Sequence, residues 1–468
     1  MKKKILLIYV LVFFIMISIP SVGMIWNETT QTKEKKELAS LPSLENKDGS
    51  FNSKVGDDFD SYLGDHFAYK QQLVTANAML RSQIFKESTE SQVIQGKDGY
   101  LFYKEGVNNY IGENVLNDRE IYNITRTLNM IQEYCNKNNI KLSFTIAPNK
   151  STLYPQYLPD NYSTQITKNN SLTKLTKSLK NTNVNYVDLK STFNNQNEVL
   201  YHKLDSHWNN KGAMLASNRI LSSINKNHTN YDDISYVVRK DYEGDLYDMV
   251  YPSGNKKDNQ IYYDIKNNFK IESENNTFED QFVETTNDNK EGNVFVFRDS
   301  FGNSMNQFIA NEYHKAYFSR ESGYNLDYLK KYNCDTLIIE ITERHLKTLQ
   351  SIIPVMEAPI VSTTRTPTTV KNNSTMEVFD FDNQYMIQGA LDKNYTSKDS
   401  NVYIKVHDGD TEFMFEATPS TYSNGKKTTN YGYGAYIDKS FIKTKSPSFE
   451  IITKKGDSFI SSGIIKKL

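Results

Sequence analysis

Apolar and polar positions divide this chain into stretches of different character. A mostly apolar, uncharged stretch from residue 5 to 26 follows the first lysines and matches the ~20 residues that cross a bilayer as a helix. Apolar residues recur at helical spacing within 51–85, and from 95 to about 354 short apolar strands alternate with helical patterns. Beyond that point the helical period disappears, and strand-like runs separated by turn residues replace it.

These stretches predict four parts: a signal anchor that crosses the membrane (1–28), a polar stalk with juxtamembrane helices (29–88), an α/β domain (89–354) and a β-sandwich (355–468). A cleaved signal peptide is the alternative to the anchor, although residues 21–24 make a poor cleavage site. In both cases the lysines stay inside and the rest of the chain is exported, either held at the cell membrane or secreted.

The α/β prediction rests on short apolar runs that suit fully buried strands, at 141–147, 184–189, 293–297, 316–319 and 336–341. Helical patterns lie between them, at 119–139, 171–179 and 210–224. This alternation is typical of a doubly wound parallel sheet covered by helices on both faces. In such a sheet the ligand site lies beyond the carboxyl ends of the strands.

Overall composition narrows the function without choosing one. Charged residues make up 24% of the chain, the net charge is −1 and no basic run occurs, so we expect no nucleic-acid partner. Cys135 and Cys334 are too few for a disulfide framework; they are predicted to be reduced core residues, with a single disulfide as the alternative. The histidines show no metal-ligand spacing, so we expect neither a metal nor another cofactor.

Two short motifs carry candidate chemistry, and each comes past the end of a predicted strand. Asp205-Ser206-His207-Trp208 precedes a helical pattern, and Arg298-Asp299-Ser300-Phe301-Gly302-Asn303 follows the strand 293–297. A serine becomes a nucleophile when a base takes its proton and a carboxylate orients that base. We therefore predict a catalytic triad of Ser300, His207 and Asp205.

A strand-to-helix turn would expose the Ser300 hydroxyl beside the free N–H groups of a helix start, which can stabilise an oxyanion. The alternative is that Asp299 and Ser300 only cap the following helix, since both residue types favour that position. The short spacing of Asp205 and His207 favours the triad, because one loop then carries both the base and its carboxylate. Trp208 is expected to wall the site or to stack on a sugar ring.

The order of these motifs resembles a permuted domain of the SGNH (GDSL-like) hydrolase family. Tyr186-Val187-Asp188-Leu189 and the Asp205 motif are similar to the last strand and Asp-x-His loop of such a domain, and Arg298-Asp299-Ser300 is similar to its opening Gly-Asp-Ser block. The last strands thus precede the first. With Gly96-Lys97-Asp98-Gly99-Tyr100-Leu101-Phe102-Tyr103 before them, they resemble the SGNH-like proteins of alginate O-acetylation and the related bacterial DHHW proteins, in a membrane-anchored Gram-positive form.

Three departures from the family pattern fall in the same site. Ser206 replaces the first histidine of the DHHW name motif, and Arg298 replaces the glycine before Asp-Ser. The glycine and asparagine that complete the family's oxyanion hole have no clear match, and by strand order they fall near Gly323 and near Glu343-Arg344. The weaker candidates for oxyanion or substrate contacts are therefore Arg320, Arg344, Gly323, Trp208 and Asn303. Each arginine has a structural ion pair as its alternative role.

The resemblance implies an O-acetyltransferase that moves acetyl groups through an acyl-serine onto hydroxyls of a cell-surface polysaccharide or exopolysaccharide. A membrane-bound O-acyltransferase is the implied donor partner, and the β-sandwich is expected either to hold the glycan or to act as a spacer. Two alternatives stay open. One is a carbohydrate acetylesterase with the same triad, and the other is a catalytically silent scaffold or glycan-binding component of an envelope polysaccharide complex.

Overall fold

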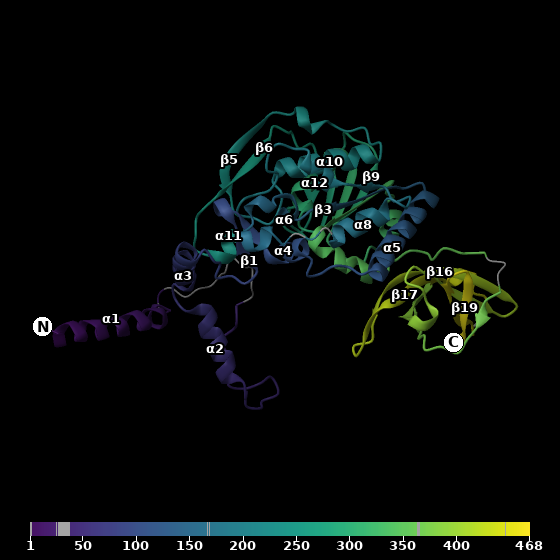
Figure 1. Cartoon of the computed structure of the whole chain (residues 1–468), viewed down its shortest axis with the longest axis horizontal. Coiled ribbons are helices and arrows are strands. Elements are labelled where there is room, and N and C mark those ends of the chain that lie inside the picture. Colours follow the sequence, from purple (N-terminus) through teal and green to yellow (C-terminus); the bar gives the residue numbers. More distant parts are fainter. Residues whose placement is uncertain are drawn as a thin grey trace.

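The computed structural model describes residues 2–24, 26, 38–165, 167, 169–362, 366–444 and 446–468. A helix, α1 (Lys2–Gly23), lies at the N-terminal end, and α2 (Val55–His66) and α3 (Lys70–Phe85) connect it to an α/β body (Figure 1). The helical spacing within 51–85 therefore belongs to two helices. Residues 27–37 of the predicted stalk lie outside the described part of the chain. Within the described part, no helix is both long and apolar enough to cross a membrane, so the predicted anchor stays a prediction.

The α/β body is built on a seven-stranded sheet in the order β4-β3-β11-β9-β10-β8-β7. Five of these strands run parallel: β4 (Tyr186–Val187), β3 (Lys141–Ala147), β11 (Thr336–Thr342), β9 (Asn293–Phe297) and β10 (Lys315–Ser319). β8 (Phe282–Thr286) and β7 (Lys270–Glu272) extend the sheet antiparallel at one edge. The predicted parallel α/β sheet is confirmed, and the antiparallel edge adds to it.

The spatial order of the parallel strands shows the permutation directly. If β9, the strand before Ser300, is counted as the first, the order across the sheet is 2-1-3-4-5, a common order for doubly wound sheets. On this count β3 and β4 are the fourth and fifth strands, yet they come first in the chain. The strand order reverses between β9 and β11, so the carboxyl end of β9 is the switch point at which such folds bind ligands.

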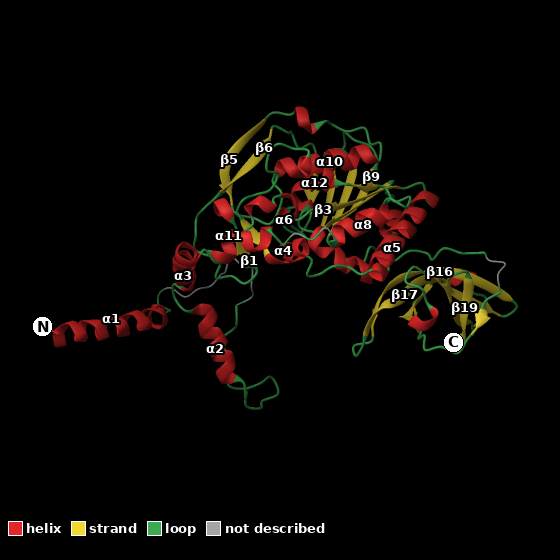
Figure 2. Cartoon of the chain, in the orientation of Figure 1, coloured by secondary structure: helices red, strands yellow, loops and turns green. Residues whose placement is uncertain are grey.

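Helices cover both faces of the sheet because successive residues of its central strand are apolar and point to opposite faces. In β9, the even-numbered residues of 294–297 pack in one layer with α10 (Asn210–Ser223) and α12 (Gly302–Ala310). The odd-numbered residues pack on the other face with α5 (Asp118–Lys137) and α8 (Ser171–Leu179). Figure 2 shows these helices around the strands. All four β9 side chains are fully buried, which explains why the sequence shows an uninterrupted apolar run.

An insertion between α10 and β7 extends the body beside the carboxyl ends of the strands. It contains a two-stranded hairpin, β5 (Tyr236–Tyr242) and β6 (Asp258–Tyr263), with the short helix α11 (Asp245–Val250) between its strands. A second small hairpin, β1 (Val93–Gln95) and β2 (Leu101–Tyr103), packs against α11. The apolar runs used for the prediction do not cover β5 and β6, because β5 is exposed to solvent along nearly its whole length.

The C-terminal domain consists of strands that form one folded sheet, in the order β12-β19-β18-β15-β16-β17-β14-β13. The bounds are β12 (Thr368–Thr369), β13 (Glu377–Asp380), β14 (Gln384–Ala390), β15 (Val402–Asp408), β16 (Thr411–Ser423), β17 (Thr428–Asp438), β18 (Ser448–Lys455) and β19 (Ser458–Lys467). β16 pairs with β15 through its first half and with β17 through its second half. Tyr385 of β14 and Phe449 of β18 meet at a ring-centroid distance of 5.9 Å, although three strands separate them in the sheet. The sheet thus encloses its own core, and the predicted all-β domain is confirmed.

Buried cations on α5 attach the C-terminal domain to the body, below α5 in Figure 1. The Arg119 guanidinium, in a side chain only 2% exposed, donates to the carbonyls of Ser397, Lys398, Ser400 and Asn430. Two helical turns further along α5, the Arg126 guanidinium donates to the Glu416 carboxylate of β16 at 2.7 Å. One face of α5 thus packs on the sheet, and its opposite, polar face is covered by the C-terminal domain.

We expect Arg119→Ala to loosen the attachment of the C-terminal domain. The change leaves several buried carbonyls without their donor, which costs about 1–3 kcal/mol. Limited proteolysis should then cut the 352–362 connection faster than in the parent protein. Lys137→Ala is the matched control, because the Lys137–Glu357 pair at 3.8 Å is exposed and contributes little. Equal cleavage rates for both variants would contradict this role of Arg119.

Candidate active site

Ser300 lies on the turn between β9 and α12, at the switch point of the sheet. Its neighbour Phe301 is fully buried, and the Asn303 N–H donates to the Ser300 carbonyl at 3.2 Å, which starts the helical turn. The Ser300 hydroxyl is not used as a cap, because it contacts His207 rather than a backbone N–H of α12. The geometry therefore favours the nucleophile interpretation over the capping alternative.

His207 connects the two sequence motifs. Its Nε2 lies 2.8 Å from Ser300 Oγ, and its Nδ1 lies 2.7 Å from Asp205 Oδ1. Since a carboxylate accepts the Nδ1 proton, Nε2 is left to accept the serine proton, as a general base requires. The structure thus brings together all three residues predicted for the triad, from positions 93 residues apart for the serine and the base.

The electrostatics of this pair suit a base that is held by a carboxylate. Burial alone would raise the pKa of Asp205, but the charge and the hydrogen bonds of His207 outweigh burial and lower it well below its usual range. Burial would lower the pKa of His207, but the Asp205 carboxylate outweighs this and raises it. Asp205 is 3% exposed and stays ionised beside the imidazole.

A buried lysine binds the backbone of the loop that carries His207. Lys150, at the carboxyl end of β3, donates from Nζ to the carbonyls of His202 at 2.9 Å and Asp205 at 2.5 Å. Burial is the main reason that the pKa of Lys150 falls to about 8, with the Asp205 charge opposing the shift. The loop closes on itself through the His202 N–H, which donates to the His207 carbonyl at 3.2 Å.

A second carboxylate, Asp245, adjoins the triad and was not predicted from the sequence. Its backbone N–H donates to Asp205 Oδ2 at 2.9 Å, and its carboxylate accepts from the Ser206 N–H at 2.7 Å and hydroxyl at 2.6 Å. Burial and the Asp205 charge raise the pKa of Asp245 to about 6. Ser206, which stands where the family has a histidine, therefore ties the base loop to α11. The only feature of the sequence that marks Asp245 is its position before the apolar residues of α11.

Arg298 has a defined structural role in place of the family's glycine. Its guanidinium donates to the carbonyls of Phe278 and Asp280 at 2.8 Å and to Asn303 Oδ1 at 2.7 Å. It thus holds the 278–280 loop against the turn of the nucleophile. Burial and the nearby Arg320 charge lower the pKa of Arg298 to about 10, so it stays a cation at neutral pH. A Cβ on Gly302 would lie 2.7 Å from Arg298 Cβ, which is why a glycine follows Phe301.

Asp299 fixes the turn from the opposite side. Its carboxylate accepts the Phe301 N–H at 2.9 Å, the Thr342 N–H at 2.8 Å and His345 Nδ1 at 3.1 Å. Burial opposes its ionisation, but the hydrogen bonds from His345 and Thr342 outweigh burial and lower the pKa of Asp299 well below its usual range. The apolar patterns of the sequence give no signal for Thr342 or His345, because their partner lies more than forty residues away.

The weaker candidates are divided between the site and its surroundings. Arg320 and Asn303 line the cleft, and Asn303 Oδ1 accepts from Arg298 and from Arg320 at 3.5 Å, which turns its amide N–H groups away from both cations. Arg344 instead packs over the Phe301 ring at 5.3 Å, and Gly323 is exposed and outside the cleft lining. Trp208 also lines the cleft, but it is 1% exposed and donates its indole N–H to the Phe301 carbonyl, so it acts as a wall of the site.

A cleft of about 1110 Å³ opens in front of Ser300. Its described lining residues all fall within 205–320. They come from the base loop, α10, the β5–β6 hairpin, α11, β7, the 275–280 loop, the β9–α12 turn, α12 and the residue after β10. His207 keeps a side-chain exposure of 21%, so the base is reachable from the cleft. Of the described part of the C-terminal domain, no residue lines this space.

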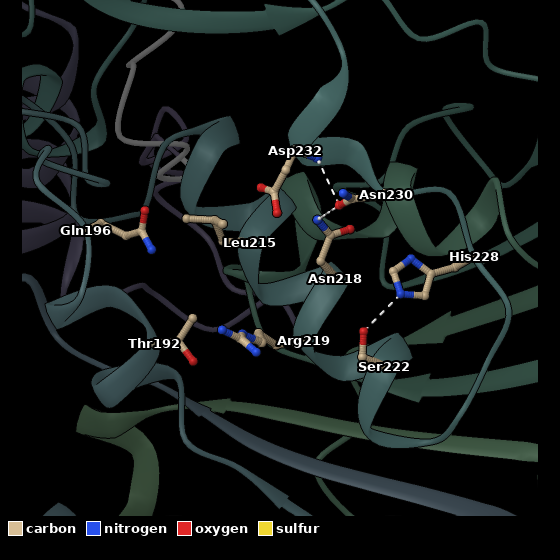
Figure 3. A pocket seen from close by; sticks show the side chains of 9 residues that line it. All are labelled: Thr192, Gln196, Leu215, Asn218, Arg219, Ser222, His228, Asn230 and Asp232. Carbon is tan, nitrogen blue, oxygen red and sulfur yellow. Dashed lines mark hydrogen bonds between the residues drawn. The ribbon is translucent and has the colours of Figure 1, made fainter.

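Another cavity, of about 510 Å³ on the outer face of α10, contains a second serine–histidine contact (Figure 3). Ser222 Oγ lies 3.0 Å from His228 Nε2. His228 Nδ1, however, contacts the Thr229 carbonyl at 2.7 Å, and in Figure 3 Asn218 and Asn230 lie between Asp232 and the His228 ring. Ser222 also sits inside a helix. This contact lacks the carboxylate and the turn that accompany Ser300.

Among the described residues, Asp205, His207 and Asp245 are the one group close enough to hold a metal ion, with donor atoms within 4.8 Å of one another. Both imidazole nitrogens are already used, since Nδ1 faces Asp205 and Nε2 faces Ser300. A metal would have to displace the Asp205 contact. The donor set therefore fits a proton-transfer site better than a metal centre.

Comparison with known families identifies part of this body. Residues 93–290 match the family model of the SGNH hydrolase-like domain of the acetyltransferase AlgX. The match contains Asp205, His207 and Asp245, and it ends before the β9 strand that leads to Ser300. The predicted resemblance to the SGNH-like proteins of alginate O-acetylation is confirmed for this segment. Comparison with curated proteins gives no match.

Solved structures similar to this chain include a DHHW family protein from Eubacterium siraeum, at 16% identity, which covers 54% of this chain and 94% of its own, with a TM-score of 0.41. PatB1 from Bacillus cereus has 14% identity, 54% and 96% coverage and a TM-score of 0.42. AlgX from Pseudomonas aeruginosa has 11% identity, 74% and 86% coverage and a TM-score of 0.38.

We expect acylation of Ser300 to slow as the pH falls through the raised pKa of His207, because the imidazolium cannot accept the serine proton. The acidic limb of kcat/KM for an activated acetyl ester should therefore lie above the usual histidine value of about 6.5. Asp205→Asn removes the charge that raises this pKa. It should move the limb to lower pH and reduce kcat by about 10⁴-fold, since the tautomer is no longer fixed. If the acidic limb of kcat/KM stayed at the same pH in Asp205→Asn, this result would contradict the role of Asp205 in raising the pKa of His207.

Gly302→Ala should destabilise the protein by about 1–3 kcal/mol, because the new methyl group overlaps Arg298 Cβ. Displacing Arg298 also releases the 278–280 loop, so activity should fall with stability. Gly323→Ala is the matched control, since nothing lies within 4 Å of a Cβ there. Thermal unfolding of both variants measures the difference. If Gly323→Ala lowered the midpoint as much as Gly302→Ala, the crowding argument would fail.

Proposed function

We propose, on the premise that residues 93–290 are an SGNH hydrolase-like domain of the AlgX acetyltransferase type, that this protein is an O-acetyltransferase acting on an extracytoplasmic polysaccharide. The observation that carries the proposal is His207, which bridges Asp205 and Ser300 at hydrogen-bond distances. In this proposal Ser300 is the nucleophile, His207 the general base and acid, and Asp205 the residue that orients the base. Residues 89–354 form the catalytic part and 355–468 the accessory part.

The first half-reaction transfers the acetyl group to the enzyme. Ser300 Oγ attacks the carbonyl carbon of the acetyl donor while His207 Nε2 takes the hydroxyl proton. When the tetrahedral intermediate collapses, His207 returns that proton to the departing oxygen of the donor. The products are acetyl-Ser300 and the protonated leaving group, and the imidazole is neutral again.

Two donors are positioned for the oxyanion of this intermediate. The Ser300 backbone N–H has no acceptor within the described part of the chain, and it stands next to the reacting oxygen. The Asn303 side-chain amide lines the same cleft, with its oxygen turned to Arg298. Preorganised N–H donors of this kind are worth about 10²–10³-fold each in kcat.

The second half-reaction releases the acetyl group to a hydroxyl. His207 removes the proton of a polysaccharide hydroxyl, whose oxygen attacks acetyl-Ser300, and the proton returns to Ser300 Oγ as the ester leaves. Water in place of that hydroxyl makes the same site an acetylesterase. The volume of the cleft, about 1110 Å³, supports a polymeric acceptor. Because His207 is oriented between Asp205 and Ser300, the site is less compatible with a catalytically silent scaffold.

In this proposal the chain works outside the cytoplasm. The lysine-led apolar stretch at its N-terminal end supports export, with attachment to the cell membrane through that stretch. A membrane-bound O-acyltransferase would supply the acetyl group at the membrane face. The acceptor would be a cell-surface or exported polysaccharide.

Incubation with an activated acetyl ester should add one acetyl group to Ser300, which peptide mass spectrometry locates directly. Ser300→Ala should abolish this adduct and the acetylation of added glycan oligomers. Ser222→Ala is the matched control, because Ser222 also contacts a histidine but lacks the carboxylate and the turn. Its activity should stay within about twofold of the parent protein.

The products separate the alternatives. Acetylated oligomers that depend on Ser300 support the transferase, whereas acetate alone across a range of neutral and charged oligomers indicates the esterase. An acetyl group on the protein that persists in Ser300→Ala would contradict the proposal. Absence of any Ser300-dependent turnover would favour the scaffold.

A further inference from the structure

The imidazole of the triad lies close to two carboxylates. His207 Nδ1 is 2.7 Å from Asp205 Oδ1 and 3.6 Å from Asp245 Oδ2. The two acids come from different elements, the loop before α10 and the first residue of α11. The reaction proposed above uses Asp205 alone, so the second carboxylate has no assigned part in the chemistry.

The Ser206 hydroxyl connects Asp245 to the imidazole. Ser206 Oγ donates to Asp245 Oδ2 at 2.6 Å, and on its other side it lies 3.3 Å from His207 Nδ1. The Nδ1 proton, which Asp205 accepts, therefore has Ser206 Oγ as a second and weaker acceptor. A carboxylate at the end of such a chain polarises the hydroxyl and strengthens the bond beyond it. Ser206 is 6% exposed, so the chain lies out of bulk water.

Backbone donors hold the Asp245 carboxylate in this position. Its Oδ1 accepts the N–H groups of Ser206 at 2.7 Å and of Leu246 at 2.6 Å. The Asp245 N–H in turn donates to Asp205 Oδ2 at 2.9 Å. Oδ2 of Asp245 is thereby left for the Ser206 hydroxyl and the imidazole. The second carboxylate is thus oriented before the imidazole takes up a proton.

The charge on Asp245 acts on the imidazole in the same sense as that on Asp205. Burial lowers the pKa of His207, Asp205 and then Asp245 raise it, and Arg344 opposes them. Asp245 itself has a pKa of about 6 because of burial and the Asp205 charge, so it is mostly ionised above pH 7. The other titratable groups around this pair, from further elements, are His202, Lys150 after β3 and Tyr242 of β5.

We propose that Asp245 is a positioning residue of this site, which supports the His207 imidazolium through the Ser206 hydroxyl and through its own charge. The inference rests on the proposed function and adds a second carboxylate to it. When His207 Nε2 takes a proton from Ser300 or from an acceptor hydroxyl, the positive charge forms between Asp205 and Asp245, and the Nδ1 proton stays on the ring. This happens once in each half-reaction. Asp205 keeps the larger effect, because its contact with Nδ1 is the shorter one.

A titration of His207 by NMR tests the contact directly. In the full chain with ¹⁵N-labelled histidine, His207→Gln identifies the signal among the seven histidines. Asp245→Asn should move the His207 titration to lower pH, because it removes an anion beside Nδ1. Ser206→Ala should move it in the same direction by less, since both charges remain. Asp264→Asn is the matched control, because it removes the same charge from an exposed position of the same insertion, outside the cleft lining.

Turnover of an activated acetyl ester measures the effect on catalysis. At a pH well above both titrations, Asp245→Asn should lower kcat about tenfold, a fraction of the roughly 10²–10⁴-fold that general acid–base catalysis supplies. The acidic limb of kcat/KM should move together with the NMR titration. In the Ser206→Ala background the loss caused by Asp245→Asn should be smaller, because the hydroxyl that transmits part of the effect is gone.

A carboxylate that only clamps the loop would give a different result. Asp245→Asn would then lower kcat and the midpoint of thermal unfolding, but the His207 titration would stay in place, and the inference would be overturned. An equal shift in Asp264→Asn, or a moved titration with unchanged kcat, would overturn it as well. If the parent protein forms no acetyl-Ser300, the proposed function fails, and this failure is distinct because the His207 titration does not depend on turnover.

Discussion

The buried Asp205 carboxylate is the interaction on which the site depends. One of its oxygens holds the imidazole of His207 and the other accepts the N–H that begins α11, so a single side chain fixes the base and one wall of the cleft. Its own backbone carbonyl is held by Lys150 from the end of β3. A buried charge is tolerable only when it is fully hydrogen-bonded, and here the compensating donors are the residues that need positioning. Stability and alignment of the site therefore have the same cause.

The nucleophile depends on a comparable arrangement across the sheet. A glycine before Asp-Ser would leave the turn free of side chains, whereas Arg298 spans it and binds the 278–280 loop through carbonyl oxygens. That link requires Gly302, because the arginine stem occupies the space of a Cβ. The departure from the family pattern is thus a coupled pair of residues. It connects the position of Ser300 to the 278–280 loop, which lines the cleft.

The sequence predicts most reliably what depends on local pattern. The apolar run of β9, buried on both faces, and the short spacing of Asp205 and His207 suffice to predict a parallel sheet and three residues that meet. The permuted order is predicted from the resemblance to the SGNH family. It does not predict Asp245, Thr342 or His345, because each contributes through a contact that the fold creates between distant segments. It misses the β5–β6 hairpin because β5 is exposed to solvent and is not a buried apolar run. The directions of Trp208 and Arg344 are likewise not given by sequence pattern, because both side chains pack against Phe301.

The two serine–histidine contacts of this chain show why geometry, and not residue identity, makes a candidate catalytic site. Ser222 and Ser300 lie at nearly the same distance from an imidazole nitrogen, 3.0 and 2.8 Å. At Ser222 the far nitrogen meets a neutral carbonyl, which stabilises an imidazolium much less than a carboxylate does. The serine also lies within a helix, where the N–H groups are already used by the helix itself and cannot receive an oxyanion. Of these two sites, the β9–α12 turn is the one that combines a charged partner for the base with the Ser300 backbone N–H, and such a turn arises where the strand order of the sheet reverses.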